Sequence, residues 1–239
     1  MVEQLIELAV GDLVRAKIGN PLVHHPIVMG HMLEIAAAEP PDAIPFHRAA
    51  ALALLHDISA VPKITTQMVA EMRLEDPERA DALELARHQH RILHMREGSA
   101  MAHRILLECN RHFGRSVFVA DDIEAVCEAI RIHDNPTLDI PIPREDWFAT
   151  AFREADRLWM VTPEGIQVDL VRNDRDPSDP AACLEQLHKN VARFKKERSL
   201  YPDEDTEGPF FDDETFFRTD GGGRLFNRLL GEAQELWKT

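Results

Sequence analysis

The stretch Ala-Leu-Ala-Leu-Leu-His-Asp, residues 51–57, joins five apolar side chains to an imidazole and a carboxylate. The apolar run predicts a buried helix with the doublet His56–Asp57 at its end. A carboxylate without a partner is costly in an apolar setting, so we expect Asp57 to meet a cation or a hydrogen-bond donor. The alternative is structural: His56 ends the helix and Asp57 caps the next turn.

Apolar residues recur at spacings of three and four along the chain, as in Ile105, Leu106 and Cys109. Sustained alternation with a period of two is nearly absent, so the sequence predicts an all-α fold. Breakers such as Gly19-Asn20-Pro21 mark helix limits. The helices are expected at residues 2–18, 26–38, 43–57, 65–73, 77–94, 97–112, 121–133, 145–161, 164–173, 179–198 and 222–237.

The chain has 239 residues, of which 44% are hydrophobic. This length suits one sizeable core or one domain with an appendage, and we favour the second. An acidic, breaker-rich stretch begins at Tyr201 and predicts a loop before a docked tail. We therefore expect an N-terminal helix at 1–19, a helical domain at 20–175 and a C-terminal helical extension at 176–239, packed on the core.

Acidic residues outnumber basic ones by 42 to 27, which gives a formal net charge of -15. This charge argues against a surface that neutralises phosphates, so no nucleic-acid polymer is expected as a partner. A small anionic substrate is compatible with the charge if a local Arg, Lys or metal ion attracts it. The sequence is compatible with a homo-oligomer.

Cysteine usage and hydropathy indicate the compartment. Cys109, Cys127 and Cys183 have no CxxC spacing and fall in predicted helices, so we expect reduced thiols. No apolar run approaches the roughly 18 residues of a membrane span. The start Met-Val-Glu-Gln lacks the features of a signal peptide. The sequence thus predicts a soluble cytoplasmic protein with no membrane partner.

Four further residues lie at positions where packing alone would favour a different type of side chain. His25 precedes Pro26 at a helix start, His94 and His133 each end an apolar helical stretch, and Asp156 lies among large apolar residues. Imidazole and carboxylate ligands suit Fe, Mn, Zn or Mg, and residues from several helices converge only at the centre of a bundle. A structural alternative exists for three of them: His94 and His133, near a helix C-terminus, gain from the helix dipole without any metal, and Asp156 can pair with Arg153 or Arg157.

The order of these elements resembles the HD superfamily of metal-dependent phosphohydrolases, which is named for its His-Asp doublet. The resemblance covers about residues 20 to 162 and implies an HD-type helical bundle. It is carried by the motifs His25-Pro-Ile-Val-Met-Gly, Ala-Leu-Leu-His56-Asp57-Ile, His94-Met-Arg-Glu-Gly98, Ile-Arg-Ile-His133-Asp and Ala155-Asp156-Arg157. The implied metal ligands are His25, His56, Asp57 and Asp156, with His94 and His133 completing a second metal position.

The resemblance also implies a reaction. A metal-activated water would attack a nucleotide or another small phosphate ester or anhydride, with Asp57 as the bridging ligand that orients it. One or two divalent ions are implied, drawn from Mn, Fe, Mg, Co, Ni and Zn. The 23 residues from His133 to Asp156 resemble the hydrolase branch more than the di-iron oxygenase branch, which uses the same ligands. A binding module without turnover is the third hypothesis.

Many of these hydrolases continue as His-Asp-x-Gly-Lys, whereas this chain continues as Ile58-Ser59-Ala60. The lysine often proposed to contact phosphate is therefore missing at its usual place. This absence is the reason to retain the hypothesis of a binding module without turnover. Other cations have to substitute for it, and Arg157 alone sits beside a predicted ligand. The candidates for substrate binding are Lys63, Arg91, Arg96 and Arg157.

Three histidines compete for the first ligand position: His24, His25 and His31. We choose His25 because the following Pro26 and the small Gly30 fit the pattern of the superfamily. His24 aligns after a shift of one residue. His31 lies one to two turns further along, where it would line the pocket.

Overall fold

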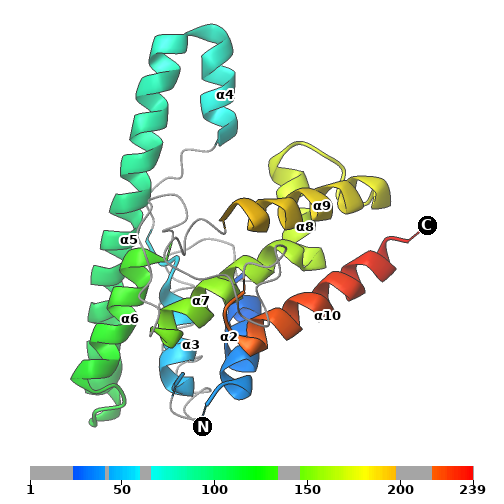
Figure 1. Ribbon diagram of the computed structural model, residues 1–239. Coiled ribbons are helices and arrows are strands. Elements are labelled where there is room, and N and C mark those ends of the chain that lie inside the picture. Colours follow the sequence, from blue (N-terminus) through cyan, green and yellow to red (C-terminus); the bar gives the residue numbers. More distant parts are fainter. Residues whose placement is uncertain (1–23, 41–42, 60–65, 134–145, 198–216, 239) are drawn as a thin grey trace. The chain divides into compact units, whose positions relative to one another are not determined.

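The structure is a computed structural model that describes residues 24–40, 43–59, 66–133, 146–197 and 217–238. Within these ranges the chain forms helices and no strand (Figure 1), which confirms the predicted all-α class. The predicted helix at 2–18 and the loop after Tyr201 lie outside the described residues. The helices are α2 (His24–Ala38), α3 (Phe46–Leu55), α4 (Thr66–Glu75), α5 (Pro77–Phe113), α6 (Ala120–Ile132), α7 (Trp147–Leu158), α8 (Pro163–Arg172), α9 (Pro180–Glu197) and α10 (Asp220–Leu236), with a 3₁₀ helix η2 (Trp159–Val161) after α7.

The chain divides into two compact units. Among the described residues, unit 1 holds those from Leu54 to His133, and unit 2 holds those up to Ala53 and from Asp146 onwards. Unit 1 therefore contains α4, α5 and α6. Unit 2 contains α2, most of α3, α7, η2, α8, α9 and α10. The domain limits expected from the sequence, at 19/20 and 175/176, stay predictions.

One prediction about helix limits is wrong, because residues 77–94 and 97–112 form the single helix α5. The expected break lies just before Gly98, a residue type that costs a helix about 1 kcal/mol relative to Ala. In the structure Gly98 is buried, and a Cβ atom there would lie 3.4 Å from Cγ2 of Ile130 on α6. Packing against α6 offsets the weak propensity of glycine, so the helix continues.

Both ends of α5 carry strong capping signals. At the start, the Asp76 carboxylate accepts the N–H of Arg79 at 3.1 Å, and Pro77 occupies the first helical position. At the end, Gly114 adopts the left-handed conformation with φ 59° and donates its N–H to the carbonyl of Arg111. A residue with a Cβ atom is strained in that conformation, so glycine fixes the end of the helix.

The side chain of Asn110 closes the turn from α5 to α6. Its Oδ1 accepts the N–H groups of Val117 at 2.7 Å and Phe118 at 2.9 Å, and its Nδ2 donates to the carbonyl of Phe118 at 2.7 Å. Asp122 then accepts the N–H of Val119 at 2.9 Å and caps the start of α6. With these backbone groups satisfied, α6 runs back along α5 (Figure 1).

Two reciprocal hydrogen bonds tie the middle of α5 to α6. The Ser99 hydroxyl donates to the carbonyl of Cys127 at 2.8 Å, and the Cys127 thiol donates to the carbonyl of Ser99 at 3.5 Å. Burial raises the pKa of the Cys127 thiol, which keeps it protonated. The pair is therefore a structural link that fixes the register of the two helices. Cys109 and Cys183 are also buried free thiols.

In unit 2, ten of the twelve residues of α7 are buried, so neighbouring elements cover this helix on several sides. From α2, Nδ1 of His31 donates a hydrogen bond to the carbonyl of Ala155 at 3.2 Å. The helix continues as η2, where Nδ2 of Asn190 on α9 donates to the carbonyl of Met160 at 2.7 Å. α10 also packs on α7 and on α2.

A fully buried carboxylate, that of Glu154 on α7, accepts hydrogen bonds from the residues just before α10. Its Oε1 accepts the N–H groups of Arg218 at 2.5 Å and Thr219 at 3.2 Å, and its Oε2 accepts the Thr219 hydroxyl at 2.5 Å. The Thr219 hydroxyl also accepts the N–H of Gly222 at 2.9 Å, as the N-cap of α10. Burial raises the pKa of Glu154 to about 7, although the hydrogen bonds act in the opposite direction.

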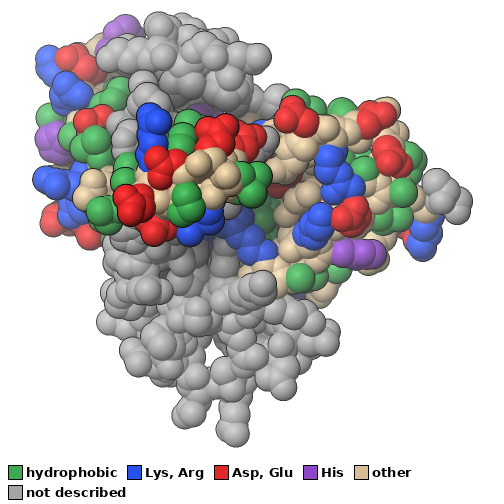
Figure 2. Space-filling model, turned by 90° about the horizontal axis from the view of Figure 1, so that it is seen from above, with side chains coloured by type: hydrophobic (Ala, Val, Ile, Leu, Met, Phe, Trp, Pro, Cys, Tyr) green, Lys and Arg blue, Asp and Glu red, His purple; other side chains and the backbone are tan. Residues whose placement is uncertain are grey.

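Acidic and basic side chains intermingle over the described part of the face shown in Figure 2. Charged side chains of unit 2 form pairs, such as Arg175 and Lys189 with Glu185. None of the helices in the described ranges is long and apolar enough to span a membrane. The cytoplasmic location and the oligomeric state stay predictions.

We predict that Glu154 makes the stability of the protein depend on pH. Its pKa is about 7 in the folded protein and 4.5 ordinarily, so it stabilises the fold most below pH 4.5. This contribution is lost as the pH rises through 7, with a decline of about 2–3 kcal/mol between about pH 5 and 8. Urea unfolding of the metal-free protein should show the decline, whereas Glu154→Gln, which cannot ionise, should lack it. Parallel pH profiles of the two proteins would contradict the assignment.

Candidate metal centre

His56 and Asp57 lie directly after α3, in the turn that follows Leu55. The N–H of Ile58 bonds to the carbonyl of Leu55 at 3.2 Å and closes this turn. His56 is only 1% exposed, whereas the Asp57 side chain is 23% exposed. The doublet therefore follows a buried helix, as the sequence predicts, and solvent reaches part of the carboxylate.

α5 passes close to this turn at Gly98. A Cβ atom at Gly98 would lie 3.5 Å from the carbonyl oxygen of His56 and 3.8 Å from Cβ of Ser59. His94 lies four residues before Gly98 and so shares the same face of α5. The close approach at Gly98 thereby brings the His94 imidazole to the carboxylate of Asp57.

One carboxylate oxygen of Asp57 lies near two imidazoles. Its Oδ1 is 2.7 Å from Nε2 of His94 and 3.6 Å from Nε2 of His133. The ligand atoms offered by these three residues all lie within 4.8 Å of one another. The ring of His56 joins the group, with its centroid 5.5 Å from that of His133. Four residues that the sequence proposes as metal ligands thus gather within unit 1.

A backbone contact fixes the orientation of His133, which follows the last residue of α6. Its Nδ1 lies 2.7 Å from the carbonyl oxygen of Ile130. A carbonyl can only accept, so in the neutral ring Nδ1 carries the proton and Nε2 presents its lone pair on the side of Asp57. Metal-ligating histidines are commonly held in this way, with one nitrogen on a carbonyl and the other on the ion.

Asp57 in turn orients His94. Within the part of the chain that the structure describes, Nδ1 of His94 has no hydrogen-bond partner. The 2.7 Å contact of Nε2 with Asp57 is therefore what holds this ring, which is only 4% exposed. A buried polar ring requires such a bond, because leaving it unsatisfied is costly.

The donor set of Asp57, His94 and His133 fits a divalent metal ion. Carboxylate oxygen and imidazole nitrogen together suit Mn, Fe, Co, Ni or Zn, and the mixture does not select among them. The two imidazoles are buried while the carboxylate is partly exposed, which leaves a route from solvent to the site. This buried His and Asp group could therefore hold a metal ion. The identity and number of ions stay predictions.

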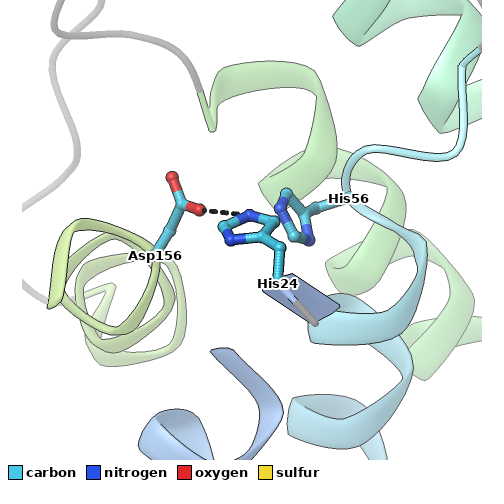
Figure 3. Close-up of side chains that lie close together, drawn as sticks. All are labelled: His24, His56 and Asp156. Carbon is cyan, nitrogen blue, oxygen red and sulfur yellow. Dashed lines mark ion pairs between the residues drawn. The ribbon is translucent and has the colours of Figure 1, made fainter. Parts of the chain in front are cut away.

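Unit 2 contains a second pair, His24 and Asp156 (Figure 3). Nε2 of His24, the first residue of α2, lies 3.2 Å from Oδ1 of Asp156 on α7. The His24 ring packs edge-on against Trp159 with centroids 5.0 Å apart, and Nη1 of Arg157 lies 3.6 Å from Oδ2 of Asp156. His56, also labelled in Figure 3, belongs to unit 1. Within unit 2, Asp156 thus has a histidine and an arginine as partners.

The three histidines that compete for the first ligand have different surroundings. His24 is the one that pairs with Asp156. His25, our choice from the sequence, is 3% exposed in the first turn of α2. His31 bonds to the carbonyl of Ala155, and burial lowers its pKa. The pairing favours His24 as a candidate, while the ligand role of His25 stays a prediction.

The predicted substrate-binding cations differ in their positions. Arg157 is buried beside Asp156, and Arg96 is exposed on α5 in unit 1. Lys63 and the side chain of Arg91 lie outside what the structure describes. Arg157 is therefore a cation next to a predicted ligand, in line with its place in the sequence.

Sequence reasoning does not single out Glu154 or Thr219, although they join α7 to α10. A signal exists for Thr219, because Thr-Asp before a helical pattern is a typical N-cap sequence. For Glu154 no local signal exists, since the partners of its carboxylate lie 64 and 65 residues later in the chain.

No protein-family model, curated protein or solved structure matches this chain. The chemical case for a metal centre rests on the donor atoms of Asp57, His94 and His133.

We predict that unit 1 binds a divalent ion through His94 and His133. His94→Ala and His133→Ala each remove one nitrogen ligand, and we expect the affinity for Mn²⁺ to fall at least about 10-fold. Electron paramagnetic resonance of free Mn²⁺ during a titration measures this affinity. His103→Ala is the control, because His103 is an exposed histidine of the same helix as His94. Unchanged affinity in both site variants would exclude this ligand set.

Proposed function

We propose that the protein is a metal-dependent phosphohydrolase of the HD type that acts on a nucleotide or another small phosphate ester or anhydride. The observation that carries this proposal is the approach of His94 and His133 to one carboxylate oxygen of Asp57, with His56 beside them. A chance His-Asp dipeptide at a helix end gives no reason for histidines from two other helical segments to converge on it. The order of these residues in the sequence matches the resemblance described above.

The proposed ligand set follows the resemblance, with His24 as the alternative to His25. A bound divalent ion would polarise a phosphoryl oxygen and lower the pKa of a coordinated water far below that of bulk water, towards about 7. The proposed ligands are His25, His56, Asp57, His94, His133 and Asp156.

Asp57 has the features of a residue that orients the attacking water. Its side chain is 23% exposed, so water and substrate can reach it, whereas the side chains of His94 and His133 are 6% and 3% exposed. The imidazoles are held by Asp57 itself and by the carbonyl of Ile130. Rigid ligands beside an accessible carboxylate favour a fixed direction of attack.

The proposed substrate is small and anionic. The formal charge of -15 repels a phosphate at long range, so cations at the site have to overcome this field. Arg157 lies 3.6 Å from Asp156, a proposed ligand, and could supply such a charge in addition to the metal. We propose that Arg157 takes the place of the lysine that is missing after the doublet, with Lys63 and Arg96 as further candidates.

Asp57→Asn tests the proposal with a small change of shape. With Mn²⁺ or Mg²⁺ present, we expect phosphate release from nucleotides or dinucleoside polyphosphates to fall at least about 100-fold, because the oriented carboxylate is lost. The circular dichroism spectrum should remain that of the wild type. Asp81→Asn is the matched control, since Asp81 is an exposed acid of α5 paired with Arg73. Full activity of Asp57→Asn would contradict the proposal.

The same assays separate the rival classes. Oxygen consumption with bound iron, and no phosphate release, would indicate an oxygenase on this scaffold. A protein that retains no metal and shows no turnover with any added divalent ion would be a binding module. Phosphate release under anaerobic conditions with Mn²⁺ or Mg²⁺ would exclude both.

A further inference from the structure

The C-terminal helix α10 contacts the two helices that carry His24 and Asp156. It packs on α2, which begins with His24, and on α7, which holds Asp156. All three helices belong to unit 2. A helix that is attached to both partners of an ion pair can set the distance between them.

The attachment of α10 to α7 consists of buried polar contacts. Both carboxylate oxygens of Glu154 are used: Oε1 accepts from the N–H groups of Arg218 and Thr219, and Oε2 accepts from the Thr219 hydroxyl. A Cβ atom at Gly222 would collide with Oε2, so glycine allows the helix start to approach this closely. Glu154 and Thr219 are fully buried, so losing one partner of these bonds is costly.

The attachment of α10 to α2 combines close backbone packing with charged contacts. A Cβ atom at Gly221 would lie 2.8 Å from Cα of Ile35, so the two backbones nearly touch. The N–H of Gly221 donates to Oε1 of Glu39 at 3.2 Å. About two turns further along α10, Nη2 of Arg228 lies 2.9 and 2.7 Å from the two oxygens of Glu34. α10 is therefore attached to α2 at two points, near Gly221 and at Arg228.

Helix geometry links these contacts to Asp156. Residues two apart on an α-helix are separated by about 200°, so Glu154 and Asp156 leave α7 on opposite sides. Between them, the carbonyl of Ala155 accepts the hydrogen bond of His31 from α2. A rotation of α7 by about 20° would move side-chain atoms about 5–6 Å from the axis by about 2 Å. Such a movement would disrupt the 3.2 Å contact between Asp156 and His24, and it would also break the contacts of Glu154 with the start of α10.

We propose that α10 acts as a brace that aligns Asp156 with His24, and that Glu154 and Thr219 are positioning residues for the metal ligands of unit 2. This inference rests on the proposed function, because it assumes that Asp156 takes part in the metal centre. It gives the C-terminal helix α10 a role in the site, because α10 would hold a proposed ligand in place.

The test compares Thr219→Val with Thr219→Ser. Valine has nearly the shape of threonine but removes the hydroxyl that joins Glu154 to the cap of α10, whereas serine keeps it. We expect Thr219→Val to bind Mn²⁺ about 10-fold more weakly than the wild type, the size typical of residues that orient ligands, and Thr219→Ser to bind as the wild type does. Hydrogen exchange of the metal-free proteins should show lower protection of α7 in Thr219→Val alone.

Asn190→Ala is the control for a general loss of stability. It removes a buried hydrogen bond to the carbonyl of Met160 in the same unit, and the other hydrogen bonds of the Asn190 side chain go to Asp169 and Gln186 rather than to α10 or Asp156. We expect this variant to melt at a lower temperature and to retain wild-type affinity for Mn²⁺. If Asn190→Ala loses affinity as Thr219→Val does, the effect is one of stability and the brace is overturned.

Two outcomes separate this inference from the proposed function. If the wild type binds no divalent ion and hydrolyses no phosphate compound, the proposed function fails and the brace fails with it. If the wild type binds Mn²⁺ and releases phosphate while Thr219→Val does both equally well, the proposed function stands and only the brace is overturned.

Discussion

A buried imidazole and a partly exposed carboxylate, those of His94 and Asp57, lie 2.7 Å apart, and the candidate site of unit 1 depends on that contact. α5 has to run unbroken past the turn at His56, and Gly98 lets it approach the backbone there. α6 has to return in one register, which the reciprocal bonds between Ser99 and Cys127 fix. A shift of α6 by one residue would turn its side chains by about 100° and carry His133 away from the carboxylate.

Buried polar groups in this protein have two different kinds of surroundings. Ser99 and Glu154 are satisfied by polar groups of neighbouring segments, so their bonds explain why they are buried. His94 and His133 are instead directed at the same oxygen of a carboxylate side chain that is 23% exposed. Two imidazoles beside one oxygen of a partly exposed carboxylate exceed what a helix cap requires. This difference in partners is the physical reason for treating Asp57 and its neighbours as a functional site and the other groups as structural ones.

The apolar spacing of three and four was sufficient to predict the all-α class, and the doublet after a buried helix was found where the pattern indicates. The break predicted within α5 was wrong, because the stabilising contact of Gly98 comes from Ile130, which is distant in sequence. The pairing of Asp156 with His24 could not be derived, since the sequence pattern favours His25 and adjacent residues at a helix start point about 100° apart. The role of Glu154 depends on partners more than sixty residues away, which no local pattern encodes.

Elemental analysis of the purified wild-type protein tests the central claim most directly, because the account depends on a metal ion at the site of Asp57, His94 and His133. The protein should retain one or two divalent ions per chain through gel filtration, or regain them after incubation with Mn²⁺ and removal of excess metal. A protein that carries no divalent metal in either preparation, while remaining folded, would contradict the account.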